Sequence, residues 1–115
     1  MADQQVPLTP AMFHVLLALA DEDKHGYAIL KEVAEQTNEE VQLSTGTLYG
    51  IIKRLLETGM IKEVRKPAAK NEDPRRRYYR LTETGREIAV AEAKRMEKLL
   101  YRARTKRLIR TFGSA

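Results

Sequence analysis

The sequence of 115 residues contains no cysteine and no tryptophan, and only 6% of its residues are aromatic. Without cysteine, disulfide bonds, thiol catalysis and cysteine-ligated zinc are excluded. The longest uninterrupted apolar run, Val15 to Ala20, is far shorter than the roughly 18 to 20 residues that span a bilayer. The N-terminus has no basic stretch followed by an apolar one, so no signal peptide is expected. We therefore expect a cytoplasmic protein.

The sequence also lacks the local motifs of common enzyme classes. It has no glycine-rich phosphate loop, no H-E-x-x-H and no G-x-S-x-G motif. Its two histidines lie on different expected elements: His14 within an apolar helix, where packing is expected, and His25 before Gly26, where a turn or cap is expected. We therefore expect no enzyme activity, no metal site and no cofactor.

What the chain does contain is an uneven distribution of charge. The net charge is +5, yet residues 1–60 carry 4 Lys/Arg against 9 Asp/Glu, whereas residues 61–115 carry 17 Lys/Arg against 7 Asp/Glu. A basic half of this kind favours contact with a polyanion. The alternative is a solvated basic surface without a partner, and charge alone does not separate the two.

Hydrophobic periodicity predicts one mainly α-helical domain with a small β-hairpin. Helices are expected from Pro10 to about residue 21, over 25–37, over 45–57 and from Thr82 to about Arg110. The second helix is expected to bury Tyr27, Leu30 and Val33 or Ala34. Strands are expected over 41–43, 60–66 and 76–81. This order is that of a winged helix-turn-helix domain followed by a long C-terminal helix.

The last helix is expected to be roughly 40 Å long, whereas a domain of this size has a radius of gyration near ~13 Å. It must therefore project from the body, and its apolar stripe then requires a partner, most simply a second copy of the chain. We expect residues 1–81 to form the DNA-binding domain and residues 82–115 to form a dimerisation helix with a basic tail. The expected dimer residues are Ile88, Ala89, Ala93, Met96, Leu99, Leu100 and Ala103.

Two segments indicate DNA binding. The helix over 45–57 begins with hydroxyl side chains that can contact phosphates or base edges; alone, it also fits a capped core helix with surface charges. The loop and strand start over 66–77 gather cations that can reach a phosphate backbone or minor groove, and Tyr78 and Tyr79 point to opposite faces behind them. The candidate DNA-binding residues are Ser44, Thr45, Thr47, Tyr49, Lys53, Lys66, Lys70, Arg75, Arg76 and Arg77.

Three motifs in this order resemble those of the PadR-like transcriptional regulators. They are "HGYAILKEV" (25–33), "STGTLYGIIKRLLETGMI" (44–61) and "RRRYYRLTETGRE" (75–87), and the resemblance covers about residues 8–100. It implies a winged-helix homodimer, often a repressor of a nearby operon, of the type with a single C-terminal helix. The family pattern places Thr45, Thr47 and Tyr49 on the recognition helix and residues 75–77 on the wing.

Three questions remain open from sequence. Some short members of this family bind flat aromatic drugs at the dimer interface, but Tyr101 is the one aromatic residue in the stripe region here. A drug-binding pore is therefore not expected, and the sequence identifies no inducer. The basic tail can extend the DNA footprint or satisfy the helix C-terminus, and the second reading is favoured. The alternative to a regulator of transcription is a winged-helix adaptor that binds protein without specific DNA binding.

Overall fold

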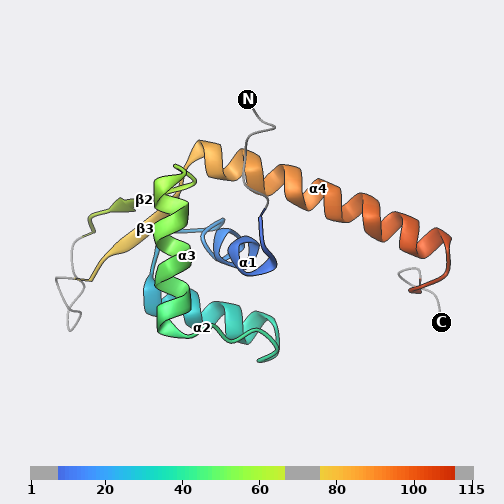
Figure 1. Ribbon diagram of the computed structural model, residues 1–115, viewed down its shortest axis with the longest axis horizontal. Helices are drawn as coiled ribbons and strands as arrows, with labels where there is room; N and C mark the ends of the chain where they lie inside the picture. Colours follow the sequence, from blue (N-terminus) through green and yellow to red (C-terminus); the bar gives the residue numbers. More distant parts are fainter. Residues whose placement is uncertain (1–7, 67–75, 111–115) are drawn as a thin grey trace.

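A computed structural model of the chain describes residues 8–66 and 76–110. Within these ranges it has four helices and a small antiparallel sheet (Figure 1). The elements are α1 (Pro10–Ala18), β1 (Lys24–His25), α2 (Gly26–Gln36), α3 (Thr45–Glu57), β2 (Ile61–Val64), β3 (Tyr78–Leu81) and α4 (Glu83–Thr105). The predicted order of helices and the predicted hairpin are confirmed.

Each helix begins at a polar side chain that accepts a hydrogen bond from the first turn, which satisfies one of the free backbone N–H groups there. Thr9, Ser44 and Thr82 cap α1, α3 and α4, and the ring of His25 caps α2. The predicted starts of α1, α3 and α4 are confirmed, and His25, which was expected at a turn or cap, is a cap. At the other end of α3, Gly59 has a φ of +76°, a conformation that glycine adopts without steric cost.

The sheet has the strand order β1-β3-β2, so β3 is central. The predicted strand over 41–43 was wrong, and two residues before α2, Lys24 and His25, form the third strand instead. They pair with Tyr79 and Tyr78 of β3. In the segment after α2, the backbone N–H of Val41 donates to Oγ1 of Thr37 at 3.0 Å, so a side chain satisfies the group that a strand would use.

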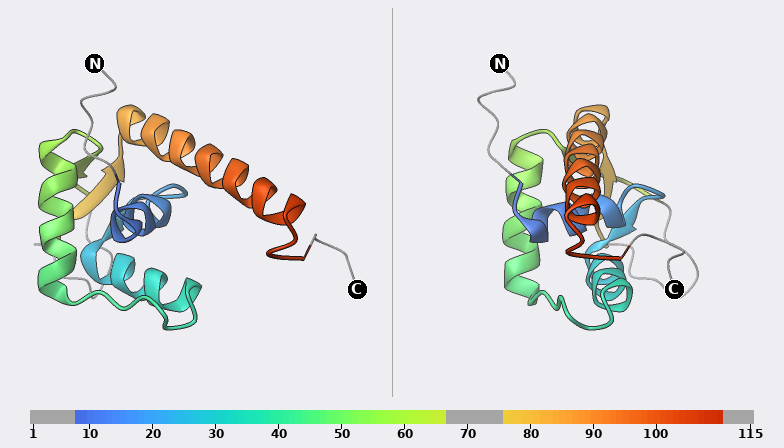
Figure 2. Two further views of the ribbon diagram at one scale, coloured as in Figure 1. Left: turned by 45° about the vertical axis from the view of Figure 1, so that its right-hand side comes forward. Right: turned by 90° about the vertical axis from the view of Figure 1, so that its right-hand side faces the viewer.

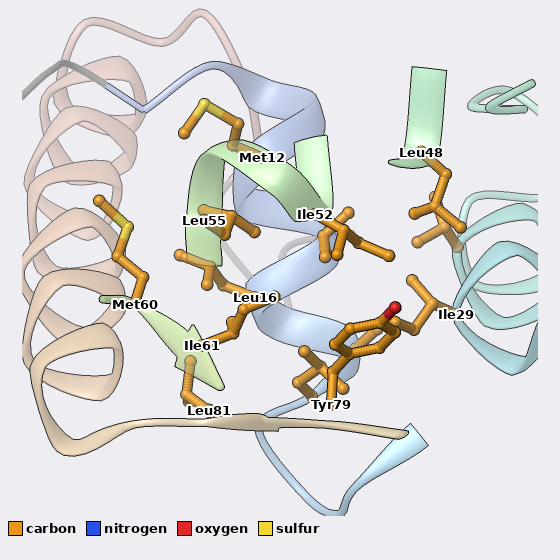
Figure 3. Packing of buried hydrophobic residues seen from close by; sticks show 14 residues of the cluster. Met12, Leu16, Ile29, Leu48, Ile52, Leu55, Met60, Ile61, Tyr79 and Leu81 are labelled. Atoms are coloured by element: carbon orange, nitrogen blue, oxygen red, sulfur yellow. The ribbon is translucent and has the colours of Figure 1, made fainter. Parts of the chain in front are cut away.

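The core lies between α1, α2, α3 and the inner face of the sheet (Figure 3). Leu16 and Leu48 are fully buried there, as is Ile29 of α2. Tyr27 was predicted on the buried face of α2, but its side chain is 66% exposed. The inward face of α2 is set by Gly26, Ile29 and Val33, whose spacing of three and four residues places Tyr27 outside the stripe.

Lys24 is buried at the corner between α1 and α2. Its ammonium group donates to the carbonyl oxygen of Ala18 and to Asp21, both at 2.6 Å, and lies 3.3 Å from Glu32. Burial by itself would lower the pKa of Lys24, but the hydrogen bonds to Asp21 and Glu32 outweigh it and leave the pKa raised. The charge is therefore retained and joins the end of α1 to α2.

The start of α4 packs on the body and the rest of the helix projects from it (Figure 2). The hydroxyl of Thr82 donates to the carbonyl oxygen of Gly59 at 2.6 Å, and Ile88 and Ala89 pack against the core. The radius of gyration is 16.4 Å, above the ~13 Å of a compact domain of this length. The helix ends at Thr105 rather than near Arg110, because Arg107 adopts a left-handed φ of 63°.

Gly85→Ala is expected to lower the free energy of unfolding by about 1–3 kcal/mol, as overpacking does in a rigid core. A Cβ at this position would overlap the backbone carbonyl of Met60, which cannot rotate away. Gly50→Ala is the matched control, because a Cβ there meets no atom within 4 Å and alanine favours a helix by up to about 1 kcal/mol. Urea denaturation distinguishes the two, and equal midpoints would contradict this account of the α4 junction.

Candidate nucleic-acid interface

The first half of α3 presents a polar, exposed face. Ser44 accepts a hydrogen bond from the backbone N–H of Thr47 at 3.0 Å and donates to the Thr47 hydroxyl at 2.9 Å. Leu48, Ile52 and Leu55 are buried on the opposite face, which fixes the direction of the exposed side chains. The four other predicted residues of this helix are all exposed: Thr45, Thr47, Tyr49 and Lys53.

The predicted cations at the base of the wing differ in how they are held. Lys66 lies 3.4 Å from the carboxylate of Asp23 and 5.7 Å from the ring centre of Tyr78. Arg77 lies 3.9 Å from Glu63, at a distance where the attraction between two exposed groups is weak. The guanidinium of Arg76 is 3.2 Å from Nε2 of His25. The two other predicted wing cations, Lys70 and Arg75, lie outside the described residues.

A cleft with a volume of about 510 Å³ lies between α3 and the base of the wing. Tyr49 of α3 lines it together with Arg76 and Arg77, so the structure brings these three predicted residues to one place. Thr45, Thr47, Lys53 and Lys66 are not among its lining residues. The remaining walls come from the start of α2 and the central strand: His25, Gly26, Tyr27 and Tyr79.

Asp23 anchors the base of the wing and was not identified from sequence. Both of its carboxylate oxygens accept hydrogen bonds from the guanidinium of Arg80, at 3.0 and 2.8 Å, and the side chain is only 11% exposed. The hydrogen bonds from Arg80, with the nearby Lys66, hold the pKa of Asp23 below its ordinary value. The signal in the sequence was the acidic run at 21–23, opposite a basic hairpin, but its partners lie more than 40 residues away.

Asp23→Asn is expected to lower the free energy of unfolding at pH 6 by about 1 kcal/mol, a modest value because Arg80 is half exposed. Since the folded-state pKa of Asp23 is depressed, its contribution is complete above the unfolded pKa of about 3.9 and is lost as pH falls through the folded value. The free energies of unfolding of the two proteins, measured in urea, should therefore differ at pH 6 and become equal in acid. A difference in the free energy of unfolding that stays unchanged at the lowest pH would contradict the anchoring role of Asp23.

The predicted dimer residues fall into two groups along α4. Ile88 and Ala89 are partly buried against the core of their own protomer. Beyond them, Leu99 and Leu100 are each 46% exposed although both are large and apolar. Ala93 is exposed, while Met96 and Ala103 are half-buried. No second chain is needed to cover the first group, whereas the second group lies on the projecting part of the helix.

In the part of the chain that the structure describes, no group of three or more His, Cys, Asp or Glu side chains is arranged to hold a metal ion. No helix within 8–66 and 76–110 is long and apolar enough to cross a membrane.

The protein has three packed helices, a hairpin beside α3 and a long final helix. This arrangement is that of a winged helix-turn-helix protein. The model of the transcriptional regulator PadR-like family matches residues 15–91, and the chain belongs to that family. The resemblance inferred from the three sequence motifs is thereby confirmed.

The chain is also similar to individual known proteins in sequence and fold. A transcriptional regulator from Clostridium thermocellum is 26% identical, with a TM-score of 0.69 over 90% of this chain and 100% of its own. Bacillus subtilis PadR, solved in complex with operator DNA, is 18% identical, with a TM-score of 0.63 over 76% of this chain and 48% of its own; at that identity the likeness shows the fold alone. Protein X of Lysinibacillus sphaericus is 29% identical over 72 residues, 63% of this chain, and the chain spans 64% of that relative's length.

Proposed function

We propose that the protein is a sequence-specific DNA-binding regulator of transcription, a homodimeric repressor that binds an inverted-repeat operator. The observation that carries this proposal is the shared cleft of Tyr49, Arg76 and Arg77. It sets the exposed face of α3 beside two guanidinium groups that face the same space. A helix that reads base edges needs neighbouring cations to fix its register on the phosphate backbone, and this arrangement supplies both.

In the proposed complex, α3 enters the major groove and the wing lies on the adjacent backbone. The hydroxyls of Thr45 and Thr47 and the phenol of Tyr49 are able to meet base edges or phosphates, while Lys53 and the wing cations neutralise phosphates. Bacillus subtilis PadR, which has this fold, was solved with operator DNA, so the fold is compatible with the same kind of partner here. Membership of a family of transcriptional regulators supports a regulatory rather than a catalytic role.

The homodimer is proposed to form through the projecting part of α4, with residues 1–81 as the DNA-binding unit and 82–115 as the dimerisation helix and tail. Large apolar side chains on a projecting helix favour a symmetric partner that covers them. Figure 1 shows α3 and the hairpin at one end of the long axis and the last turns of α4 at the other. A dimer formed through α4 therefore leaves the recognition surface uncovered.

Selection from a library of random-sequence duplexes tests this function. Two-fold symmetry predicts that the enriched sequences share an inverted repeat whose half-site centres lie roughly 34–36 Å apart along the DNA, or a multiple of that. Enrichment of a single unpaired half-site would contradict the dimer. No enrichment over the starting library would contradict sequence-specific binding and favour the adaptor function.

A further inference from the structure

Gly26, the first residue of α2, lies directly against the phenol of Tyr49 from α3. A Cβ added at Gly26 would lie 3.0 Å from Cζ of Tyr49 and closer still to its hydroxyl oxygen, and the third nearest atom would be Cδ2 of Leu48 at 3.6 Å. All three atoms belong to side chains of the recognition helix. The ring of Tyr49 therefore occupies the space that any other residue at position 26 would fill.

The backbone does not explain a glycine at this position. Among the glycines in the described ranges, Gly59 is the one with a positive φ, so Gly26 has a conformation open to any residue. Gly26 is also buried at the first position of its helix, where glycine has no helix-forming advantage over alanine. What the missing side chain provides here is room for one aromatic ring.

We infer that Gly26 is a positioning residue for DNA recognition, which acts by allowing the phenol of Tyr49 to rest on α2. This inference rests on the proposed function, in which Tyr49 contacts the operator. Tyr49 is 47% exposed, with its hydroxyl end against Gly26 and the cleft of Arg76 and Arg77 next to it. A phenol whose far end rests on α2 is held in one direction, and a directional contact to DNA requires such a fixed position.

We expect Gly26→Ala to displace the Tyr49 side chain and to leave the fold intact. The atoms that a Cβ would meet most closely are the far end of the Tyr49 side chain, which can swing away by rotation about χ1. At Gly85, by contrast, the obstructing atoms include the backbone of Met60. Gly26→Ala should therefore give a folded protein whose Tyr49 ring has left its place on α2.

The test is a double-mutant cycle of Gly26→Ala and Tyr49→Ala, read as the ratio of affinities for a selected duplex and a scrambled duplex. Gly26→Ala alone should lower this ratio by roughly five-fold or more, the lower end of what one specific base contact contributes, and leave the affinity for scrambled DNA unchanged. In the Tyr49→Ala background, the same substitution should change nothing further, because the ring it displaces is absent.

Fluorine NMR of protein labelled with 3-fluorotyrosine gives a readout without DNA. The Tyr49 resonance, assigned by its loss in Tyr49→Phe, should shift in Gly26→Ala, while the resonance of Tyr101 on the projecting part of α4 stays unchanged. An unshifted resonance, or a ratio that Gly26→Ala lowers equally in both backgrounds, would overturn the inference. A wild-type protein that does not distinguish the two duplexes would instead overturn the proposed function.

Discussion

Met96→Glu is expected to convert the proposed homodimer into monomers. Met96 lies midway along the projecting part of α4, one helical turn from Leu99 and Leu100, which are both half exposed in the single chain. An ionised carboxylate inside an apolar interface has no compensating partner, and a buried unpaired charge costs several kcal/mol. Sedimentation velocity measures the change directly.

The control for this substitution is Lys98→Glu, which adds an acid to an exposed position on another face of the same helix. It should leave the dimer intact, so that loss of the dimer in Met96→Glu reports on the stripe and not on the charge of the helix. Monomers should also lose operator affinity by roughly 10²–10⁴-fold, because the second half-site no longer binds at a high effective concentration. A Met96→Glu protein that sediments as a dimer would refute the proposed interface.

Arg76→Ala and Tyr49→Ala are expected to weaken DNA binding in different ways. Arg76 lies at the base of the wing, where the proposed complex places a phosphate contact, so its loss should weaken binding to all duplexes. The slope of log affinity against log salt should fall by about 0.9 for each lost phosphate contact. Tyr49→Ala should leave the affinity for scrambled DNA nearly unchanged and lower the preference for the selected duplex, by about 1–3 kcal/mol if the phenol contacts a base edge.

Anisotropy titrations of both variants, on selected and scrambled duplexes at several salt concentrations, separate these effects. If Arg76→Ala left nonspecific binding at low salt untouched, the wing would not contact phosphates. If Tyr49→Ala weakened both duplexes equally, Tyr49 would be a phosphate contact rather than a source of specificity. Either result would change the roles assigned to these residues in DNA binding and would not change the description of the fold.

The parts of the fold that sequence predicted are those with a local physical cause. The bounds of α3 follow from the Ser44 cap and the break at Gly59, and the hairpin follows from β-branched and aromatic residues on either side of a polar loop. The burial of Leu48, Ile52 and Leu55 follows from their helical spacing. Each of these features depends on residues a few positions apart, which is the range that periodicity and capping describe.

The parts that sequence did not predict depend on distant residues. β1 is two residues long and exists because β3 pairs with it, and neither Lys24 nor His25 has a marked preference for strands. The ion pair between Asp23 and Arg80 spans 57 positions. The contact between Gly26 and Tyr49 likewise joins two helices that only the packed core brings together.

The central claim is that a chain of this family uses α3 and the wing to recognise a particular DNA sequence. Its most direct test is a fluorescence-anisotropy titration of the wild-type protein against the selected duplex and a scrambled duplex of equal length, at two salt concentrations. We expect a preference for the selected duplex that survives the higher salt, while binding to the scrambled duplex falls steeply. Equal loss of binding to both duplexes as salt rises would instead show a basic surface without sequence recognition.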